Sequence, residues 1–500
     1  MGLIIWEVLY WAVIAAMSLF GLHRYFILFL FYKNKNKTSL PMSKLAELPH
    51  VTVQLPIFNE FYVVERLLKA VSELDYPRHL LEIQVLDDST DDTREQTRQR
   101  VDALRQQGFD AHWVHRADRT GFKAGALEAG LSTAKGEFIL ILDADFVIAP
   151  DFLQQTIHHF ADERIALVQT RWGHLNRNYS LLTRVQALFL DAHFVLEQTA
   201  RSRSGRFFNF NGTGGIWRRS SIEDAGGWQH DTLTEDLDLS YRAQLRGWRF
   251  IYRDDLVTPG ELPVEMNGFK SQQHRWAKGS IQTCKKLLPA LWRSNAPLKV
   301  KIEGTAHFTG YFVSPLVVFF CLLIQPTLAP AEKHSLQQIL FIDIPAFLFT
   351  TIPFLVFYLN AQRQLHPKEW TKNIALLPFM VAVGAGVSIN NTRAVIEALV
   401  GHQSGFIRTP KYGIEKKGQR WTTGRYSPLK SALFILEVGF ALYFCGLCAQ
   451  AIVLKNYAQL PFLLVFLFGF AYVAFQSAIQ WFPLAPWNRE DTDENKPIPA

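Results

Sequence analysis

Acidic residues follow three short stretches of this sequence that have the pattern of β-strands. Asp143 and Asp145 come after five apolar residues, Asp87 and Asp88 close a second stretch, and Glu60 follows a third. Residues two apart on a strand point the same way, so Asp143 and Asp145 can face one hard cation through oxygen ligands. Mg²⁺ or Mn²⁺ suits these ligands, and no His or Cys cluster competes for the role. As an alternative, Asp87 and Asp88 only cap the next helix.

A diphosphate is a ligand that a cation at this position would neutralise. The chain has no G-x-x-x-x-G-K-[ST] loop and no G-x-G-x-x-G after its first strand, which argues against P-loop nucleotidases and dinucleotide oxidoreductases. The diphosphate can instead be a leaving group, as it is in nucleotide sugars. The metal would then stabilise the charge that develops as the sugar–phosphate bond breaks.

Two segments further along supply the other groups that an inverting sugar transfer needs. Residues 234–236, Thr-Glu-Asp, predict a helix start and a carboxylate base for the acceptor hydroxyl, although a first turn that only complements the helix dipole would look the same. Gln272, Arg275 and Trp276 would share one helix face. That face offers an amide, a phosphate-binding guanidinium and an aromatic platform. Alternatively, Trp276 is an anchor at a membrane surface.

The sequence around these residues alternates short β-type runs with helical patterns. Strands are expected at 51–56, 82–90, 111–116 and 137–145, and helices at 60–74, 91–108 and 121–136. Such alternation predicts a doubly wound α/β domain with a parallel sheet. Domains of this kind bind ligands at the carboxyl ends of their strands, where the acidic residues are expected to lie.

Long apolar runs flank the α/β domain on both sides. They are Leu3–Tyr32, Phe308–Thr327, Ile339–Leu359, Ile374–Ile389, Ser431–Val453 and Leu460–Ala478. Because about 20 apolar residues span a bilayer, all but the run from Ile374 predict crossings. That run continues into polar residues, and we interpret it, up to Leu399, as an interfacial or re-entrant helix. A sixth crossing in its place is the alternative.

The charges around the first apolar run indicate its orientation. No basic region precedes the run, so it does not read as a secretory signal. Lys33, Lys35 and Lys37 follow it, which places the N-terminus outside and the α/β domain in the cytoplasm. The net charge of +7 suits a membrane-surface protein, and no nucleic-acid motif accompanies it. Four cysteines do not make a disulfide framework.

The motifs appear in a familiar order: D-D at 87–88, D-A-D at 143–145, T-E-D at 234–236 and Q-x-x-R-W at 272–276. This set resembles the processive, cellulose-synthase-like members of glycosyltransferase family 2. The similarity is closest to the cellulose-synthase-like A and C types, which are glucomannan and glucan synthases, and it is dense over residues 51–285. It implies a GT-A fold with a Rossmann-like parallel sheet, joined to an α-helical transmembrane bundle.

The resemblance also implies a role for each matching residue. Asp236, with Glu235, would act as the base, and Asp143 and Asp145 would hold Mg²⁺ or Mn²⁺ on the diphosphate. The donor side would comprise Pro56, Glu60, Asp87 or Asp88, Lys123, Gln272, Arg275 and Trp276. The acceptor side would comprise Asn211, Gly212, Thr213 and Trp276. A loop similar to the F-x-V-T-x-K gating motif would present Phe406, Thr409 and Lys411, with Arg408 in place of the Val.

These features predict a chain organised around the membrane. The expected units are a transmembrane helix at 1–35, the GT-A domain at 36–270, interfacial helices at 271–305, two transmembrane helices at 306–361, an interfacial helix and gating-like loop at 371–430, two transmembrane helices at 431–482 and a tail at 483–500. The chain would lie in a bacterial inner membrane, a plasma membrane or an equivalent. A nucleotide sugar, a polysaccharide, lipid and accessory export subunits are its expected partners.

Three functions are compatible with this organisation. The first is a β-glycan synthase that takes hexosyl units from UDP-glucose or GDP-mannose, between which the residues do not decide, and extrudes the polymer. The second is a transferase that adds one sugar to a lipid-linked acceptor, which needs no pore. The third, a scaffold without activity, is disfavoured by the complete acidic set.

Overall fold

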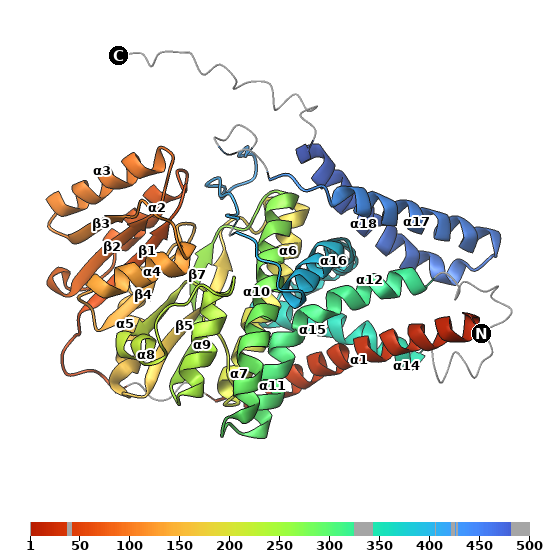
Figure 1. The fold of residues 1–500 in the computed structure, drawn as a ribbon, viewed down its shortest axis with the longest axis horizontal. Coiled ribbons are helices and arrows are strands. Elements are labelled where there is room, and N and C mark those ends of the chain that lie inside the picture. Colours follow the sequence, from red (N-terminus) through yellow and green to blue (C-terminus); the bar gives the residue numbers. More distant parts are fainter. Residues whose placement is uncertain are drawn as a thin grey trace, which may run out of the picture.

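The computed structural model describes residues 2–37, 43–324, 344–405, 407–421, 426 and 429–481. A β-sheet with its covering helices forms one end of the molecule, and long apolar helices form the other. Helices α6 (Leu181–Ala192) and α10 (Met266–Arg293) stand between the two ends (Figure 1). The molecule therefore combines an α/β domain and a helical bundle, as the sequence predicts.

The sheet contains seven strands in the order β3-β2-β1-β4-β6-β5-β7. They are β1 (Val51–Ile57), β2 (Leu81–Asp87), β3 (Asp110–His115), β4 (Phe138–Ile141), β5 (Ile165–His174), β6 (Gly215–Arg218) and β7 (Arg249–Gly260). The four predicted strands are β1 to β4, and they pair in parallel. The sheet as a whole is mixed, because the short β6 runs antiparallel to both β4 and β5. The chain order changes direction between β1 and β4, which opens a crevice at their carboxyl ends.

Helices cover both faces of the sheet because successive residues of β4, which point to opposite faces, are all apolar. In β4, Leu140 joins a core with α2 (Val64–Ser72), α3 (Thr93–Gln106) and α5 (Phe152–Thr156), whereas Ile139 joins the opposite core. That second core includes α4 (Phe122–Thr133), α8 (Arg219–Asp224) and α9 (Glu235–Leu245). Each strand end is thereby fixed between two layers, which makes the carboxyl edge a rigid support.

Two long helical segments join the domain to the bundle. In the first, α6 continues into a π-helix, η3 (His193–Gln198), and then into α7 (Thr199–Arg203). In the second, α10 runs unbroken for 28 residues and is followed by α11 (Leu298–Thr309). Both segments contact the sheet domain and the apolar helices; at the start of α10, the Asn267 N–H donates to Gln480 of an apolar helix at 3.0 Å.

The apolar end contains α1 (Gly2–Asn34), α12 (Val313–Leu323), α14 (Ile344–Thr350), α15 (Ile352–Leu365), α16 (Leu377–Leu399), α17 (Phe434–Val453) and α18 (Leu460–Trp481). Five described segments are long and apolar enough to cross a membrane: Ile5–Asn34, Leu298–Leu323, Trp370–Leu399, Phe434–Val453 and Tyr457–Trp481. Four of these coincide with predicted crossings. The predicted crossing at Ile339–Leu359 begins outside the described residues.

Helix α16 is the segment that the sequence predicts to lie at the interface. Its length and composition also permit a crossing, so this assignment stays a prediction. Figure 1 shows α16 nearly end-on, whereas α1, α12, α17 and α18 run along the length of the molecule. The helix packs closely on α18, where the space for a Cβ on Gly469 is taken by the Ala382 carbonyl oxygen, 2.1 Å away. Small residues allow such close approach of two helix backbones.

We expect Gly469→Val to destabilise the protein by about 1–3 kcal/mol, because the larger side chain must push α16 and α18 apart. Thermal unfolding of the detergent-solubilised protein measures this loss. Gly439→Ala on α17 is the control, since a Cβ there meets nothing within 4 Å. Equal midpoints for the two variants would contradict this packing.

Candidate active site

A cleft opens at the carboxyl edge of the sheet and is closed on its other side by α10. Fifteen of the residues singled out in the sequence line it, although they come from eight separate parts of the chain: Pro56, Glu60, Asp88, Lys123, Asp143, Asp145, Asn211, Gly212, Glu235, Asp236, Gln272, Arg275, Trp276, Thr409 and Lys411. Such convergence of carboxylates, cations and one indole is typical of an active site.

Two predicted residues sit behind the cleft wall, and one lies outside the described residues. Asp87 is fully buried and accepts hydrogen bonds from Trp113 Nε1 and the Ser89 N–H, both at 2.9 Å. Of the two neighbouring aspartates, it is therefore Asp88 that borders the cleft, with Arg116 Nε 2.8 Å from its Oδ1. Thr213 is also buried, and its hydroxyl accepts the Asp143 N–H at 2.9 Å. Phe406 is the residue outside the described ranges.

Each carboxylate of the D-A-D motif is paired with a lysine. Lys123 Nζ contacts Asp143 Oδ1 and also donates to the Gly212 carbonyl oxygen at 2.8 Å. Lys411 Nζ lies 2.7 Å from Asp145 Oδ2. These two ammonium groups neutralise the charge that a divalent cation would otherwise meet. The paired aspartates supply only oxygen ligands, and this donor set fits Mg²⁺ or Mn²⁺.

Asp236 lies in the first turn of α9, against the turn formed by Asn211 and Gly212. A Cβ on Gly212 would stand 3.2 Å from Asp236 Oδ2, and Gly212 has a φ of 82°, which favours glycine. The Leu237 N–H donates to Asp236 Oδ1 at 2.8 Å. By contrast, the nearby Asp238 is buried and pairs with Arg242 and Lys286, so its role is structural.

Helix α10 presents Gln272, Arg275 and Trp276 to the cleft, as their spacing predicts. Two buried lysines on the same helix bracket this segment. Lys270 pairs with Glu437 of α17, and Lys278 Nζ lies 2.9 Å from Glu397 of α16. The cleft face of α10 is therefore fixed by ion pairs to the apolar bundle.

The segment 407–421, which we call the strap, lines the cleft with the predicted Thr409 and Lys411 and also with Arg408, which had no predicted role. Arg408 makes a bidentate ion pair with Glu60, at 2.9 and 2.7 Å. The Tyr412 N–H donates to the buried Glu261 at 3.0 Å. Glu261 directly follows β7, so the strand-end rule that found Asp143 would also have found this carboxylate. Arg408 was visible only as a departure from the gating motif.

The cleft shifts the pKa values of two of its carboxyl groups, Asp236 and Asp143, upward. Burial, followed by the charge of Glu235, raises the pKa of Asp236 to about 7. Burial also raises the pKa of Asp143, although Lys123 opposes the shift and Asp145 adds to it. A carboxylate with a pKa near neutrality can take up a proton during a reaction at physiological pH.

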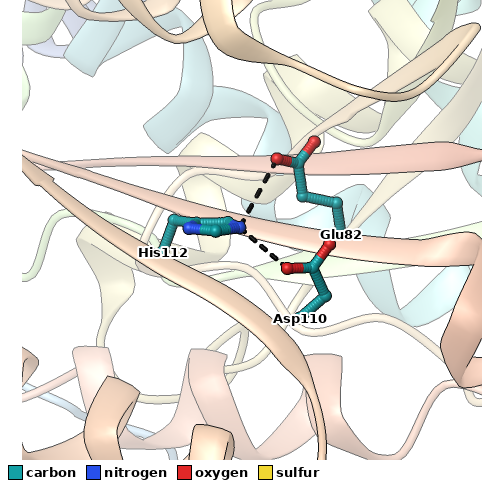
Figure 2. Close-up of side chains that lie close together, drawn as sticks. All are labelled: Glu82, Asp110 and His112. Carbon is teal, nitrogen blue, oxygen red and sulfur yellow. Dashed lines mark hydrogen bonds and ion pairs between the residues drawn. The ribbon is translucent and has the colours of Figure 1, made fainter.

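A second group of possible metal ligands lies away from this cleft. Glu82, Asp110 and His112 gather at the amino ends of β2 and β3 (Figure 2). His112 Nε2 is 2.8 Å from Asp110, Lys135 Nζ is 2.6 Å from the other oxygen of Asp110, and Thr52 donates to Glu82 at 2.6 Å. These partners satisfy the carboxylates without an ion, so we interpret the group as a structural ion cluster.

Comparison with known proteins agrees with this geometry. The family described as "Glycosyltransferase like family 2" matches residues 49–279. A glucomannan 4-beta-mannosyltransferase from Arabidopsis thaliana is 35% identical over 424 residues, which are 80% of this chain and 76% of the relative. A glucomannan 4-beta-mannosyltransferase from Oryza sativa subsp. japonica is 34% identical, over 80% of this chain and 77% of the relative. The chain belongs to glycosyltransferase family 2.

This family 2 glycosyltransferase is cellulose-synthase-like, and it is a hexosyltransferase. Its fold is the GT-A fold. A mannosyltransferase from Pyrobaculum calidifontis, solved in complex with GDP-Man and Mn²⁺, has a TM-score of 0.55 and 22% identity. The alignment covers 80% of this chain and all of the other. With five candidate spans among its described residues, the chain combines this fold with apolar helices suited to a membrane.

We expect kcat/KM to fall as the pH is lowered through about 7, because Asp236 must be ionised to accept a proton and its pKa is raised to about 7. The acid limb of the pH–rate profile measures this. Glu223→Gln serves as a control, since Glu223 is an exposed carboxylate of α8 outside the cleft. Asp236 would be excluded as the base if Asp236→Asn were fully active, or if this variant kept the acid limb of the wild-type pH–rate profile.

Proposed function

We propose that this chain transfers mannosyl units from GDP-mannose to a growing β-linked glycan. The observation that carries the proposal is the single cleft that contains Asp145, Asp236 and the Q-x-x-R-W face of α10. The names of the relatives favour mannose over glucose. The guanosine donor bound by the Pyrobaculum calidifontis enzyme agrees with this choice, although that likeness concerns the fold alone.

In this proposal, Asp236 takes the proton of the acceptor hydroxyl. The freed oxygen attacks the anomeric carbon opposite the nucleoside diphosphate, so the bond to phosphate breaks as the new glycosidic bond forms and the configuration inverts. Trp276 supports the acceptor sugar with its aromatic face. Lys123 and Arg275 stabilise the charge of the departing diphosphate.

The nucleoside half of the donor would lie at the ends of β1 and β2, where Pro56, Glu60 and Asp88 line the cleft. Asp143 and Asp145 would hold the metal. When bound, Mg²⁺ or Mn²⁺ supplies Lewis-acid stabilisation of the leaving diphosphate. Lys411 would release Asp145 for this purpose, which couples the strap to donor binding.

For the membrane half, we propose that the catalytic domain faces the cytoplasm and the N-terminus lies outside. Lys33, Lys35 and Lys37 on the domain side of α1 support this orientation. The direction of α16 relative to α1, α12, α17 and α18 supports an interfacial α16. A polysaccharide is too polar to cross hydrocarbon unaided, so we propose that the helices beside the cleft also carry the product across.

We expect the purified full-length protein to transfer from GDP-mannose to manno-oligosaccharides at least about tenfold faster than from UDP-glucose. EDTA or Asp145→Ala should lower the rate at least about 100-fold, because the leaving charge then lacks its cation. Asp102→Asn, at an exposed carboxylate of α3, is the matched control. If the protein preferred UDP-glucose, GDP-mannose would be the wrong donor. An organic-soluble glycolipid product would favour the alternative in which a single sugar is added to a lipid-linked acceptor.

In proteoliposomes with outward-facing catalytic domains, we expect a donor added outside to yield a polymer that mannanase can digest. Mannanase added outside should digest this polymer only after detergent opens the vesicles. This protection follows if the polymer enters the lumen as it grows. Vesicles to which preformed polymer is added externally are the control for leakage. Complete digestion without detergent would exclude extrusion.

A further inference from the structure

A π-helix interrupts the helix that joins the catalytic domain to α1. Segment η3, His193–Gln198, continues α6 on one side and α7 on the other. π-Helical turns are rare and occur frequently at functional sites, because they redirect side chains that a regular helix would point elsewhere. Here the redirected side chains His193 and Gln198 both reach one residue of the cleft, Asn211.

The hydrogen bonds fix the Asn211 amide in one orientation. Gln198 Nε2 donates to Asn211 Oδ1 at 2.6 Å, and His193 Nε2 lies 3.1 Å from Asn211 Nδ2. The other nitrogen of the imidazole, Nδ1, is 3.2 Å from Glu197 Oε2. Because a carboxylate only accepts, Nδ1 carries the proton, and Nε2 is left as the acceptor for the amide N–H of Asn211.

The surroundings keep this imidazole neutral. Burial lowers the pKa of His193 to about 3, and the charges of Arg201 and Arg24 act in the same direction. A doubly protonated imidazole would present two donors and could not accept from Asn211. The neutral form is therefore the one that holds the amide.

Glu197 in turn is held by residues of the membrane-side helices. Arg24 of α1 and Arg201 of α7 both pair with its carboxylate. Arg201, which is only 2% exposed, also donates to Glu303 of α11 at 3.0 Å. An unbroken line of buried and partly buried polar contacts thus runs from α1 and α11 through Glu197 and His193 to Asn211.

Asn211 stands directly beside the candidate base. It precedes Gly212, whose Cβ position is 3.2 Å from Asp236 Oδ2, and it lines the cleft. We infer that His193 is a positioning residue that holds the Asn211 amide for the acceptor hydroxyl, and that it ties this acceptor-side group to helix α1. This inference rests on the proposed function, since it needs Asn211 to face the acceptor.

The position of the accepting atom makes the inference testable by substitution. The amide oxygen of a glutamine at position 193 can occupy the position of Nε2 and accept the same hydrogen bond. The shorter side chain of asparagine places its amide only at the position of Nδ1. Alanine has no acceptor atom. We expect transfer rates in the order wild type, His193→Gln, then His193→Asn and His193→Ala together. For His193→Ala, the ratio of transfer to donor hydrolysis should fall at least about tenfold, and the acceptor KM should rise. GDP affinity should stay within about twofold of wild type.

Two comparisons separate positioning from a general loss of stability. His307→Ala removes another partly buried histidine of the same region, whose Nδ1 lies 2.9 Å from the Tyr241 hydroxyl and which has no hydrogen bond to Asn211 among the described residues. It should lower the unfolding midpoint without changing the ratio of transfer to hydrolysis. Asn211→Ala should lower the ratio as His193→Ala does, and the double variant should be no worse than Asn211→Ala alone, because both changes remove one contact.

The outcomes also distinguish this inference from the proposed function. If the wild type transfers mannose but His193→Ala lowers transfer, hydrolysis and GDP affinity together, or if the double variant loses the sum of the single losses, the positioning role is wrong. If His193→Asn restores transfer as well as His193→Gln does, the assigned Nε2 contact is wrong. If the wild type transfers sugar from no nucleotide donor, the proposed function itself fails.

Discussion

Charge balance at the carboxyl edge of the sheet is the constraint on which the rest of this structure depends. Five separate strand ends or helix starts bring carboxylates to one cleft, and each burial would be unfavourable without a nearby cation. The cations come from distant parts of the chain: Lys123 from α4, Arg275 from α10 and Lys411 from the strap. The cleft thus forms only when the sheet, α10 and the strap are all in place.

The balance also explains why the strap lies where it does. Arg408 and Lys411 pair with Glu60 and Asp145, which belong to the ends of β1 and β4. A donor with its metal would bring its own charges to the same carboxylates. If the donor binds as proposed, it competes with the strap for Glu60 and Asp145, and the ion pairs of the cleft change on binding.

The parts of the fold that depend on local pattern were predictable from the sequence. The runs that became β1 to β4 and the helices between them carry clear periodicity, and the D-A-D, T-E-D and Q-x-x-R-W motifs lie in the cleft as expected. The antiparallel β6 was not anticipated, because four residues carry too little pattern to reveal a direction. The separation of Asp87 from Asp88 was also hidden, since adjacent residues at a strand end point to opposite sides and sequence alone does not say which side is the cleft.

Contacts between remote segments were beyond sequence reasoning. Arg408 and Glu60 are 348 positions apart, and nothing local to either residue indicates the other. The π-helix at His193–Gln198 has no compositional signal, because its residues would also fit a regular helix. Both features arise from how the domain and the bundle meet, which is decided by packing over the whole chain.

The continuity of α10 has a consequence for how this architecture can be divided. Gln272, Arg275 and Trp276 face the cleft, but the two lysines that flank them are bonded to α16 and α17. A fragment that ended at residue 265 would retain the acidic half of the cleft and lose Gln272, Arg275 and Trp276. The cleft and the apolar helices are thus one structural unit, and a transplanted catalytic domain would need α10, α16 and α17 with it.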